Sequence, residues 1–364
     1  LSVVLVAVFL LVMSSALEVI LRSPSVASTI FSLLSEIELT RFSITTKLNG
    51  ELIKCWTPSM MCRNRDDLHE YTRLTNLTIE TGGYVILTSL PPNLTKLWAR
   101  SVYGAECYFP STLTSLCVES ADNMEVTPEN FPSLEHLEVS ELSNSKILEM
   151  DQLLTLTCRS QTRSLEIDRL PANLTSLSII FNETSWKKYP FCHEFQAMLP
   201  KSLRTLTVII YNTWMKSKDW RMDVLPLGLQ ELIFTTKGRW SMAKDDHFGG
   251  ALRKISCGGV NPSKLPRELK YLVCYNIDCD ALTSVNSYIE SLKELPPNLE
   301  HLCMIPISHV NRGIVSVLPR TLRTLWFDFE DQQYQQNTFI IEADDLPPNL
   351  TNLTMANREM YIFV

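Results

Sequence analysis

Apolar and polar residues alternate along this chain in a short pattern that recurs many times, L-P-x-x-L-x-x-L-x-φ, where φ is apolar. One clear copy starts at Leu90-Pro91 and continues through Leu94 and Leu97. Aligned on the first leucine of L-x-x-L, the chain contains 13 copies, at Leu74, Leu94, Leu113, Leu134, Leu153, Leu174, Leu203, Leu229, Leu252, Leu269, Leu299, Leu322 and Leu350. A unit this short cannot bury its own apolar face, so the copies are expected to stack into one continuous core. The pattern therefore predicts a solenoid.

The last step of the pattern has the period of a β-strand. Leu116 and Val118, like Leu206 and Val208, are separated by one residue, so both side chains of each pair point to the same side of a strand. A proline precedes most copies, and proline suits a turn that enters a strand but breaks a helix. We therefore expect one short strand per repeat, and the strands of neighbouring repeats should pair in parallel.

The L-x-x-L-x-φ cores resemble leucine-rich repeats, over roughly Tyr71 to Met355. The L-P-x-x-L-x-x-L form is similar to FNIP-type repeats and to those of bacterial secreted effectors, but the Phe-Asn pair of the FNIP type occurs only at Phe181-Asn182. The resemblance implies an α/β-type solenoid of about 13 units, with a parallel β-sheet on the concave face and an irregular convex side. It also implies recognition of a macromolecule by the extended strand face.

The two ends of the chain differ from the repeats. Residues 1–16 form an uncharged apolar run that ends in Ser14-Ser15-Ala16, which is typical of a signal peptide; a clipped membrane anchor and a buried core segment are the alternatives. Residues 17–70 show no repeat and are expected to cap the array, and residues 71–364 are expected to form the solenoid. At the other end, we expect either one last strand or the loss of a C-terminal cap, anchor or domain.

Composition and motifs disfavour two classes of function. A formal net charge of −7 argues against a dedicated nucleic-acid binder, which is normally basic. The sequence contains no phosphate-binding loop, dinucleotide fingerprint, H-E-x-x-H or G-x-S-x-G motif, and its six histidines are scattered. We therefore expect no catalytic residue, no metal site and no cofactor.

The cysteines are expected to play two roles. Cys158, Cys257 and Cys274 occupy the φ position, where they should be small buried hydrophobes. Cys55 and Cys62 lie in the expected cap, where extracellular leucine-rich arrays often carry a disulfide. A disulfide between these two and a pair of free thiols remain the two alternatives.

Two asparagines are candidate glycan acceptors. Asn93 and Asn182 lie in N-x-S/T triplets at expected turns, where a glycan would be accessible in a secreted protein. The repeat itself generates the triplet Asn-Leu-Thr, so the motif alone does not establish glycosylation.

Candidate partner-binding residues form two groups. Trp98, Tyr271 and Trp326 interrupt an outward strand face of mostly Thr and Ser, a composition that β propensity alone also favours. The second group lies between Trp186 and Asp246, where ten Lys/Arg and six Asp/Glu occur. Its members are Trp186, Trp214, Lys216, Lys218, Trp220, Arg221, Arg239 and Trp240. Exposed Trp beside Lys or Arg is typical of binding hot spots, and packing of these tryptophans under the loops is the alternative.

Together these features predict a non-enzymatic leucine-rich-repeat protein, secreted or exposed at the cell surface, that binds another protein. A glycan is the alternative ligand, nucleic acid is disfavoured, and no membrane span is evident. Two alternative functions are a cytoplasmic scaffold and the recognition half of an enzyme that lacks its C-terminal domain.

Overall fold

Each repeat begins with a tight turn that leads into one strand. Where the turn starts with proline, the proline carbonyl accepts a hydrogen bond from the N–H of the first leucine, over 3.2 Å from Leu94 to Pro91 and 3.0 Å from Leu269 to Pro266. Proline keeps this acceptor although it has no N–H, so it closes a β-turn without leaving a donor unpaired. The turn explains why L-P-x-x-L recurs.

The computed structural model describes residues 59–62, 74–79, 90–101, 108–120, 126–140, 147–161, 170–181, 198–210, 225–236, 248–277, 285–304, 312–328, 339–356 and 360–363. It has two compact units, Leu1–Gln152 and Leu153–Val364. The expected signal segment, residues 1–16, and most of the expected cap lie outside the described residues.

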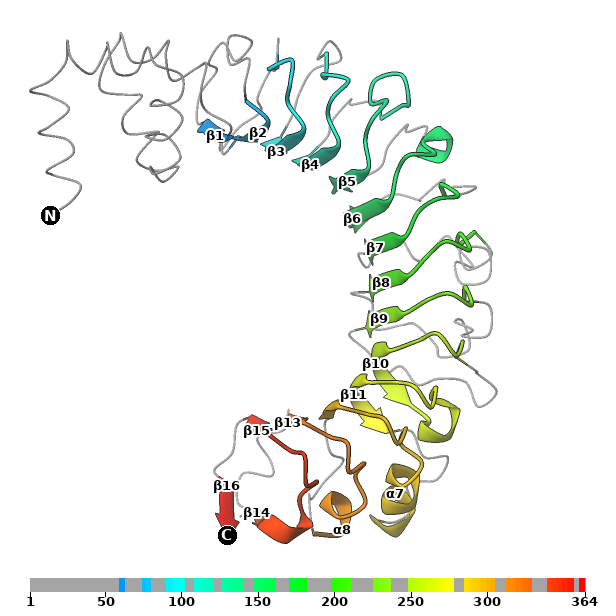
Figure 1. Ribbon diagram of the computed structural model, residues 1–364, viewed down its shortest axis with the longest axis vertical. Helices are drawn as coiled ribbons and strands as arrows, with labels where there is room; N and C mark the ends of the chain where they lie inside the picture. The colour runs from blue at the N-terminus through cyan, green and yellow to red at the C-terminus, as the bar shows by residue number, and fades with distance from the viewer. Residues whose placement is uncertain are drawn as a thin grey trace, which may run out of the picture. The chain divides into compact units, whose positions relative to one another are not determined.

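The first unit contains five strands that pair in parallel and in chain order (Figure 1). Its elements are β1 (Ser59–Cys62), β2 (Asn76–Ile79), β3 (Lys96–Ser101), β4 (Ser115–Ser120), β5 (His136–Val139) and the 3₁₀ helix η1 (Ile147–Glu149). Strand β1 precedes the first repeat and pairs with β2, so the sheet begins within the region expected to be the cap.

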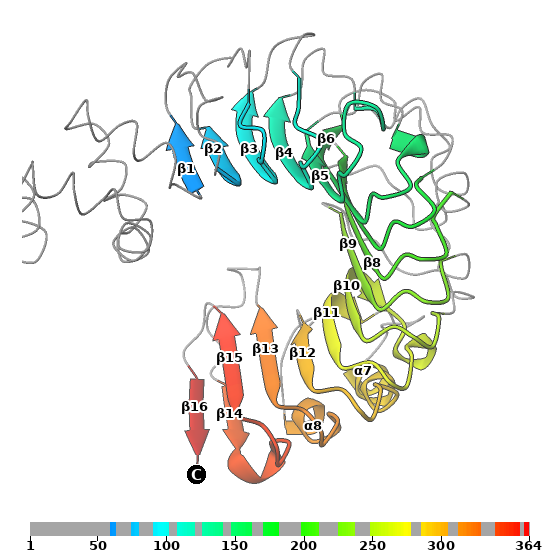
Figure 2. The same ribbon diagram turned by 45° about the horizontal axis from the view of Figure 1, so that its top comes forward.

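The second unit repeats the arrangement with nine parallel strands, β6 to β13 and β15. Its elements are β6 (Thr155–Gln161), β7 (Ser176–Phe181), β8 (Thr205–Ile210), β9 (Glu231–Thr236), β10 (Lys254–Val260), η5 (Pro262–Lys264), β11 (Tyr271–Ile277), α7 (Val285–Leu292), β12 (His301–Met304), α8 (Arg312–Val315), β13 (Thr324–Asp328), β14 (Phe339–Glu342), η7 (Ala343–Asp345), β15 (Asn352–Ala356) and β16 (Met360–Phe363). Within this unit the strands of the nine-stranded sheet lie on one side and α7 and α8 lie on the other, where α8 contacts β14 (Figure 2).

Every one of the 13 expected repeats has its strand, which confirms the predicted solenoid. The second leucine of one repeat is the register partner of the second leucine of the next, as in Leu272↔Leu302 and Leu302↔Leu325. Buried and half-buried residues alternate along β8 and along the shorter strands β2 and β12. Each fully buried leucine contributes about 1.5–3 kcal/mol by leaving water, and the stack supplies that burial only between neighbours.

The last repeat is less well covered than the others. The first leucine of each of the other repeats is at most 1% exposed, whereas Leu350 is half-buried, and so is Leu353 in β15. The last residues do form a strand, but β16 pairs in parallel with β14 in a separate two-stranded sheet and not with β15. Among the described residues, no helix has the length and apolar character needed to cross a membrane.

The cysteines at the φ position are buried, as predicted. Cys257 and Cys274 are register partners on β10 and β11, yet both are free thiols. Burial raises the pKa of Cys257 to about 12. Burial, followed by the neighbouring Cys257 and Cys303, raises the pKa of Cys274 well above its usual value. Both therefore behave as small apolar side chains.

We expect Leu302→Ala to lower the free energy of unfolding by about 2–5 kcal/mol, because the side chain is 1% exposed and its removal leaves a cavity between two repeats. Urea unfolding followed by circular dichroism measures this change. Thr207→Ala, on the half-buried outward side of β8, is the control and should change stability by about 0.5 kcal/mol or less. Equal midpoints for the two variants would contradict the stacking of the core.

Candidate functional site

The strands of the second unit carry two rows of side chains on their outward face. The first row holds the first residue of each strand, and the middle row holds the third, which lies between two buried residues. In β6 to β8 the middle row is hydroxylic, with Thr157, Ser178 and Thr207 in register. Over the next five strands it reads Ile233, Ser256, Val273, Cys303 and Trp326. The face therefore becomes mostly apolar toward β13.

Three aromatic side chains lie on this apolar part of the face, on β11 to β13. Tyr271 and His301 are register partners, and their rings stack at a centroid distance of 4.2 Å with an interplanar angle of 4°. Tyr271 is 41% exposed and Trp326 is 45% exposed. We call these three residues the aromatic surface. Trp326 lies two strands from Tyr271, which corresponds to about 10 Å across a parallel sheet.

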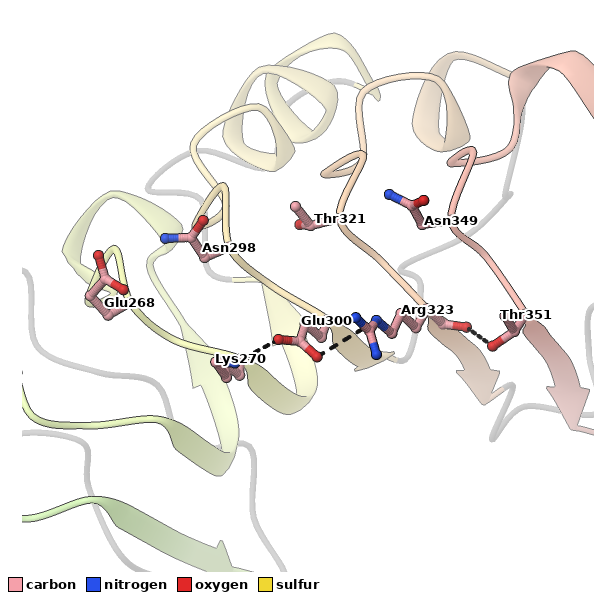
Figure 3. Close-up of a pocket in the computed structure, with 8 residues that line it drawn as sticks. All are labelled: Glu268, Lys270, Asn298, Glu300, Thr321, Arg323, Asn349 and Thr351. Atoms are coloured by element: carbon pink, nitrogen blue, oxygen red, sulfur yellow. Dashed lines mark hydrogen bonds and ion pairs between the residues drawn. The ribbon is translucent and has the colours of Figure 1, made fainter.

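The residue immediately before each strand forms a third row, the edge row. Backbone hydrogen bonds link its members: the N–H of Arg323 donates to the carbonyl of Glu300, and the N–H of Glu300 donates to the carbonyl of Lys270. The side chains of these three residues form a ladder (Figure 3). Glu300 lies 2.7 Å from the Lys270 ammonium through one carboxylate oxygen and 3.8 Å from the Arg323 guanidinium through the other.

The charges of the ladder perturb its carboxylate. The hydrogen bond from Lys270 is the largest cause and lowers the pKa of Glu300, whereas desolvation raises it. The positive charges of Lys270 and Arg323 lower it further by smaller amounts. Glu300 therefore remains ionised at neutral pH and holds two cations at one edge of the aromatic surface. His301, which follows Glu300 directly, stacks on Tyr271, so the ladder and the aromatic surface are contiguous.

An open groove of about 660 Å³ runs along this edge. It is lined by Glu268, Lys270, Asn298, Glu300, Thr321, Arg323, Asn349 and Thr351 (Figure 3). Four successive repeats contribute two residues each, one before and one after the first leucine. Because the leucine itself points into the core, the repeat places both flanking side chains at the surface.

The residue before the first leucine often ties one turn to the previous one. The hydroxyls of Ser202 and Thr321 each lie 2.7 Å from a carbonyl oxygen of the preceding repeat. The amide of Asn349 donates to the carbonyl of Arg320 over 3.1 Å. Small hydroxyl and amide side chains are therefore used at this position to satisfy turn carbonyls that the strand ladder does not reach.

The turns of the second unit also differ from those of the first in charge. We define the basic edge as five residues in each repeat from Leu203 to Leu350. These are the three residues before the first leucine, the leucine itself and the residue after it. Its charged members are Lys201, Arg204, Arg253, Arg267, Lys270, Arg320 and Arg323, with Glu268 and Glu300, a formal charge of +5. The described residues at the same positions in the earlier repeats contain no Lys or Arg and carry Glu135 and Asp151.

Three of the predicted partner-binding residues lie on the strand face. Tyr271 and Trp326 are exposed and only two strands apart, whereas Trp98 is half-buried on β3 in the first unit. The predicted loop group lies outside the described residues and remains a prediction; it comprises Trp186, Trp214, Lys216, Lys218, Trp220, Arg221, Arg239 and Trp240.

The predicted modification sites are only partly described. Asn93 lies exposed in the turn before β3, and Asn182 lies outside the described residues. Cys62 ends β1, and Cys55 lies outside the described residues, so their disulfide remains a prediction. Within the described part of the chain, no three His, Cys, Asp or Glu side chains gather in a way that could hold a metal ion.

Sequence reasoning did not identify His301 or the Lys270–Glu300–Arg323 ladder as part of a site. Each residue looks like an ordinary surface residue when it is read within its own repeat. Alignment of the position after the first leucine would have placed Lys270, Glu300 and Arg323 in consecutive repeats, because parallel strands bring equal positions together.

The fold and its strand face define a repeat solenoid, and comparison with solved structures assigns it to a class. No family model matches the chain, and neither does any curated protein compared with it. CroV588, described as a circular leucine-rich-repeat protein, is similar over 84% of this chain, with 22% identity and a TM-score of 0.50. The alignment spans 44% of the CroV588 chain.

A second solved structure is LegL7 from Legionella pneumophila, a leucine-rich-repeat-containing protein. It is 14% identical, with a TM-score of 0.33, over 70% of this chain and 87% of its own. The present chain has the fold of a leucine-rich-repeat solenoid, as its repeats predicted.

The ladder makes a prediction about acid titration. We expect the pKa of Glu300 to lie below its usual 4.5 and to rise toward that value in Lys270→Met, because the largest cause of the shift is the Lys270 hydrogen bond. A carboxyl whose folded pKa is lowered stabilises the fold above its unfolded pKa, and this contribution is lost as pH falls through the folded pKa. Carbon-13 NMR of the side-chain carboxyl measures the titration.

Lys254→Met is the matched control, since Lys254 pairs with Glu231 on the neighbouring strand instead. It should leave the titration of Glu300 unchanged. A Glu300 pKa that is the same in wild type and Lys270→Met would contradict the ladder.

Proposed function

We propose that this protein is a non-enzymatic recognition module that binds another protein over the aromatic surface of its second unit. The observation that carries the proposal is the exposure of Tyr271 and Trp326 on a rigid strand face. Among the other strand residues whose burial the structure describes, Trp98 is half-buried and Phe234 and Phe327 are buried. Trp and Tyr are enriched among interface hot spots.

The geometry favours a macromolecule over a small molecule. Small-molecule sites are usually enclosed and mostly apolar, whereas the groove beside the aromatic surface is open and lined by charged, amide and hydroxyl side chains. Contiguous aromatic and charged rows instead resemble an interface with an apolar centre and a polar rim. The sheet is held by its own ladder, so little conformational entropy is lost when a partner binds.

The double variant Tyr271→Ala/Trp326→Ala tests this assignment. The wild-type protein is immobilised and captured proteins are identified by mass spectrometry, and each is then purified and its affinity measured by calorimetry. We expect at least one partner whose binding the double variant weakens by about 2 kcal/mol or more, about thirtyfold, because hot-spot aromatics contribute this much. Circular dichroism should show an intact fold.

Tyr108→Ala is the matched control, because Tyr108 is 86% exposed but belongs to the first unit. It should leave the affinity within about twofold of wild type, as expected for a residue outside the interface. If every captured protein bound the double variant as tightly as the control, the aromatic surface would not be the binding site. If only glycans bound, the partner would be a glycan and the protein-binding assignment would be wrong.

We place the protein outside the cell as part of the same proposal, on the basis of the apolar run and small residues that end at Ala16. The second candidate is an intracellular scaffold, and the free thiols of Cys257 and Cys274 on adjacent strands favour it. Disulfides are rare inside cells, where thiols are kept reduced.

Intact mass separates these two candidates. The chain, preceded by an initiator Met, is expressed in a secretory eukaryotic host and weighed before and after treatment with glycosidase and reductant. We expect removal of the segment up to about Ala16, consistent with a signal peptide, and glycans on sites such as Asn93. An uncleaved, unglycosylated and fully reduced product would make the intracellular scaffold the better assignment.

A further inference from the structure

We infer that the basic edge binds an acidic segment of polypeptide, in an extended conformation, alongside the aromatic surface. The inference rests on the proposed function and specifies the chemistry of its partner. Its basis is a local charge of +5 in a chain whose formal net charge is −7. A patch opposite in sign to the whole molecule attracts a complementary partner at the patch and repels it elsewhere.

Four cations of the basic edge, Arg204, Arg253, Lys270 and Arg323, lie in the edge row, with Gln230 and Glu300 between them. From Arg204 to Arg323, each edge-row residue donates its backbone N–H to the carbonyl of the edge-row residue before it. Successive strands are about 4.8 Å apart, so this stretch is about 24 Å long, the length of about seven residues of extended chain. A single short segment can therefore contact the whole row.

Four of these cations are either exposed in the turns or held along the edge by hydrogen bonds. Within the described residues, no carboxylate forms an ion pair with Arg267 or Arg320, and both are exposed in the turns. The guanidiniums of Arg204 and Arg253 donate to turn carbonyls at Gly228 and Gly250, over 2.9 Å each, which holds them along the edge. An arginine that is already oriented loses less side-chain entropy when it binds a carboxylate.

The edge also carries groups that suit a peptide and not a phosphate backbone. Glu268 and Glu300 lie among the cations and repel any anionic group placed beside them. A phosphate backbone carries a charge at every step, whereas a peptide can place a neutral or basic residue opposite each of these carboxylates. The amides of Asn298 and Asn349 line the same groove and can pair with peptide N–H and C=O groups. Leu227, which is 82% exposed in the same turn position as Arg267, adds an apolar contact.

The aromatic surface favours the same occupant. One face of Tyr271 is covered by the His301 ring, and its register neighbour on the other side is Lys254. Nucleic-acid sites instead offer free aromatic faces on which successive bases stack. Tyr271 and Trp326 therefore fit apolar side chains of a peptide whose carboxylates lie along the basic edge.

The test uses the full chain and a fluorescein-labelled oligoglutamate peptide, with binding measured by fluorescence anisotropy from low to physiological ionic strength. Lys201→Gln/Arg267→Gln/Arg320→Gln removes three exposed turn cations without altering a buried residue. We expect this variant to bind the peptide about tenfold more weakly than wild type at low salt, with a shallower salt dependence, because it loses charges that face the ligand.

Lys96→Gln/Lys264→Gln/Lys293→Gln removes the same number of charges from residues that are not members of the basic edge. It should bind within about twofold of wild type if the position of the charges matters. Equal losses in both variants would show a non-specific charge effect and overturn the inference. The inference would also be overturned if oligothymidylate or a heparin oligosaccharide bound more tightly than the oligoglutamate peptide and with the same sensitivity to the edge variant. The edge would then be a nucleic-acid or glycan site.

A partner protein identified in the Tyr271→Ala/Trp326→Ala experiment distinguishes a failure of this inference from a failure of the proposed function. If its binding is lost in Tyr271→Ala/Trp326→Ala but is unchanged in the edge variant and in high salt, the recognition surface stands and the acidic-segment inference is wrong. If only the edge variant weakens binding of the partner, and a peptide from the partner's acidic region competes for that binding, the inference is supported.

Discussion

The register between neighbouring repeats is the constraint on which the rest of this structure depends. Each repeat from Leu74 to Leu322 buries its first leucine, a second leucine or isoleucine, and one further apolar residue. This burial depends on the next repeat, which presents the same three positions in register. A shift of one residue would move the leucines to the outward face and destroy the core of two repeats at once. The regular surface rows, polar or charged, follow from that register and not from any attraction among their members.

Much of the fold could be predicted from the sequence, because the signals for turn, strand and core all lie within about ten residues. The L-P turn and the L-x-φ step fixed the strand positions, and Cys257 and Cys274 could be assigned to the core from their place in the pattern. Helix α7 was not predicted, since it lies in one of the longest connections and carries no repeat signal. Nor does a local pattern indicate that β16 pairs with β14 instead of β15.

The same reasoning predicted only part of the candidate site. Tyr271 and Trp326 could be singled out because large aromatic residues are unusual at outward positions of these strands. The charged ladder could not, because Lys270, Glu300 and Arg323 are separated by connections of different length and acquire meaning only when parallel pairing sets them side by side. A pattern that is read within one repeat does not reveal the interactions between repeats.

The exposed turn position that follows proline has an evolutionary consequence. It is occupied by Lys201, Leu227, Arg267 and Pro297, two basic and two apolar residues, yet the turn hydrogen bond is the same in every case. Substitution there changes the chemistry of the surface while the proline carbonyl and the buried leucine continue to define the repeat. Binding preference in such an array can thus drift one residue at a time through sequences that all fold, and a duplicated repeat brings with it a new position that selection can rewrite.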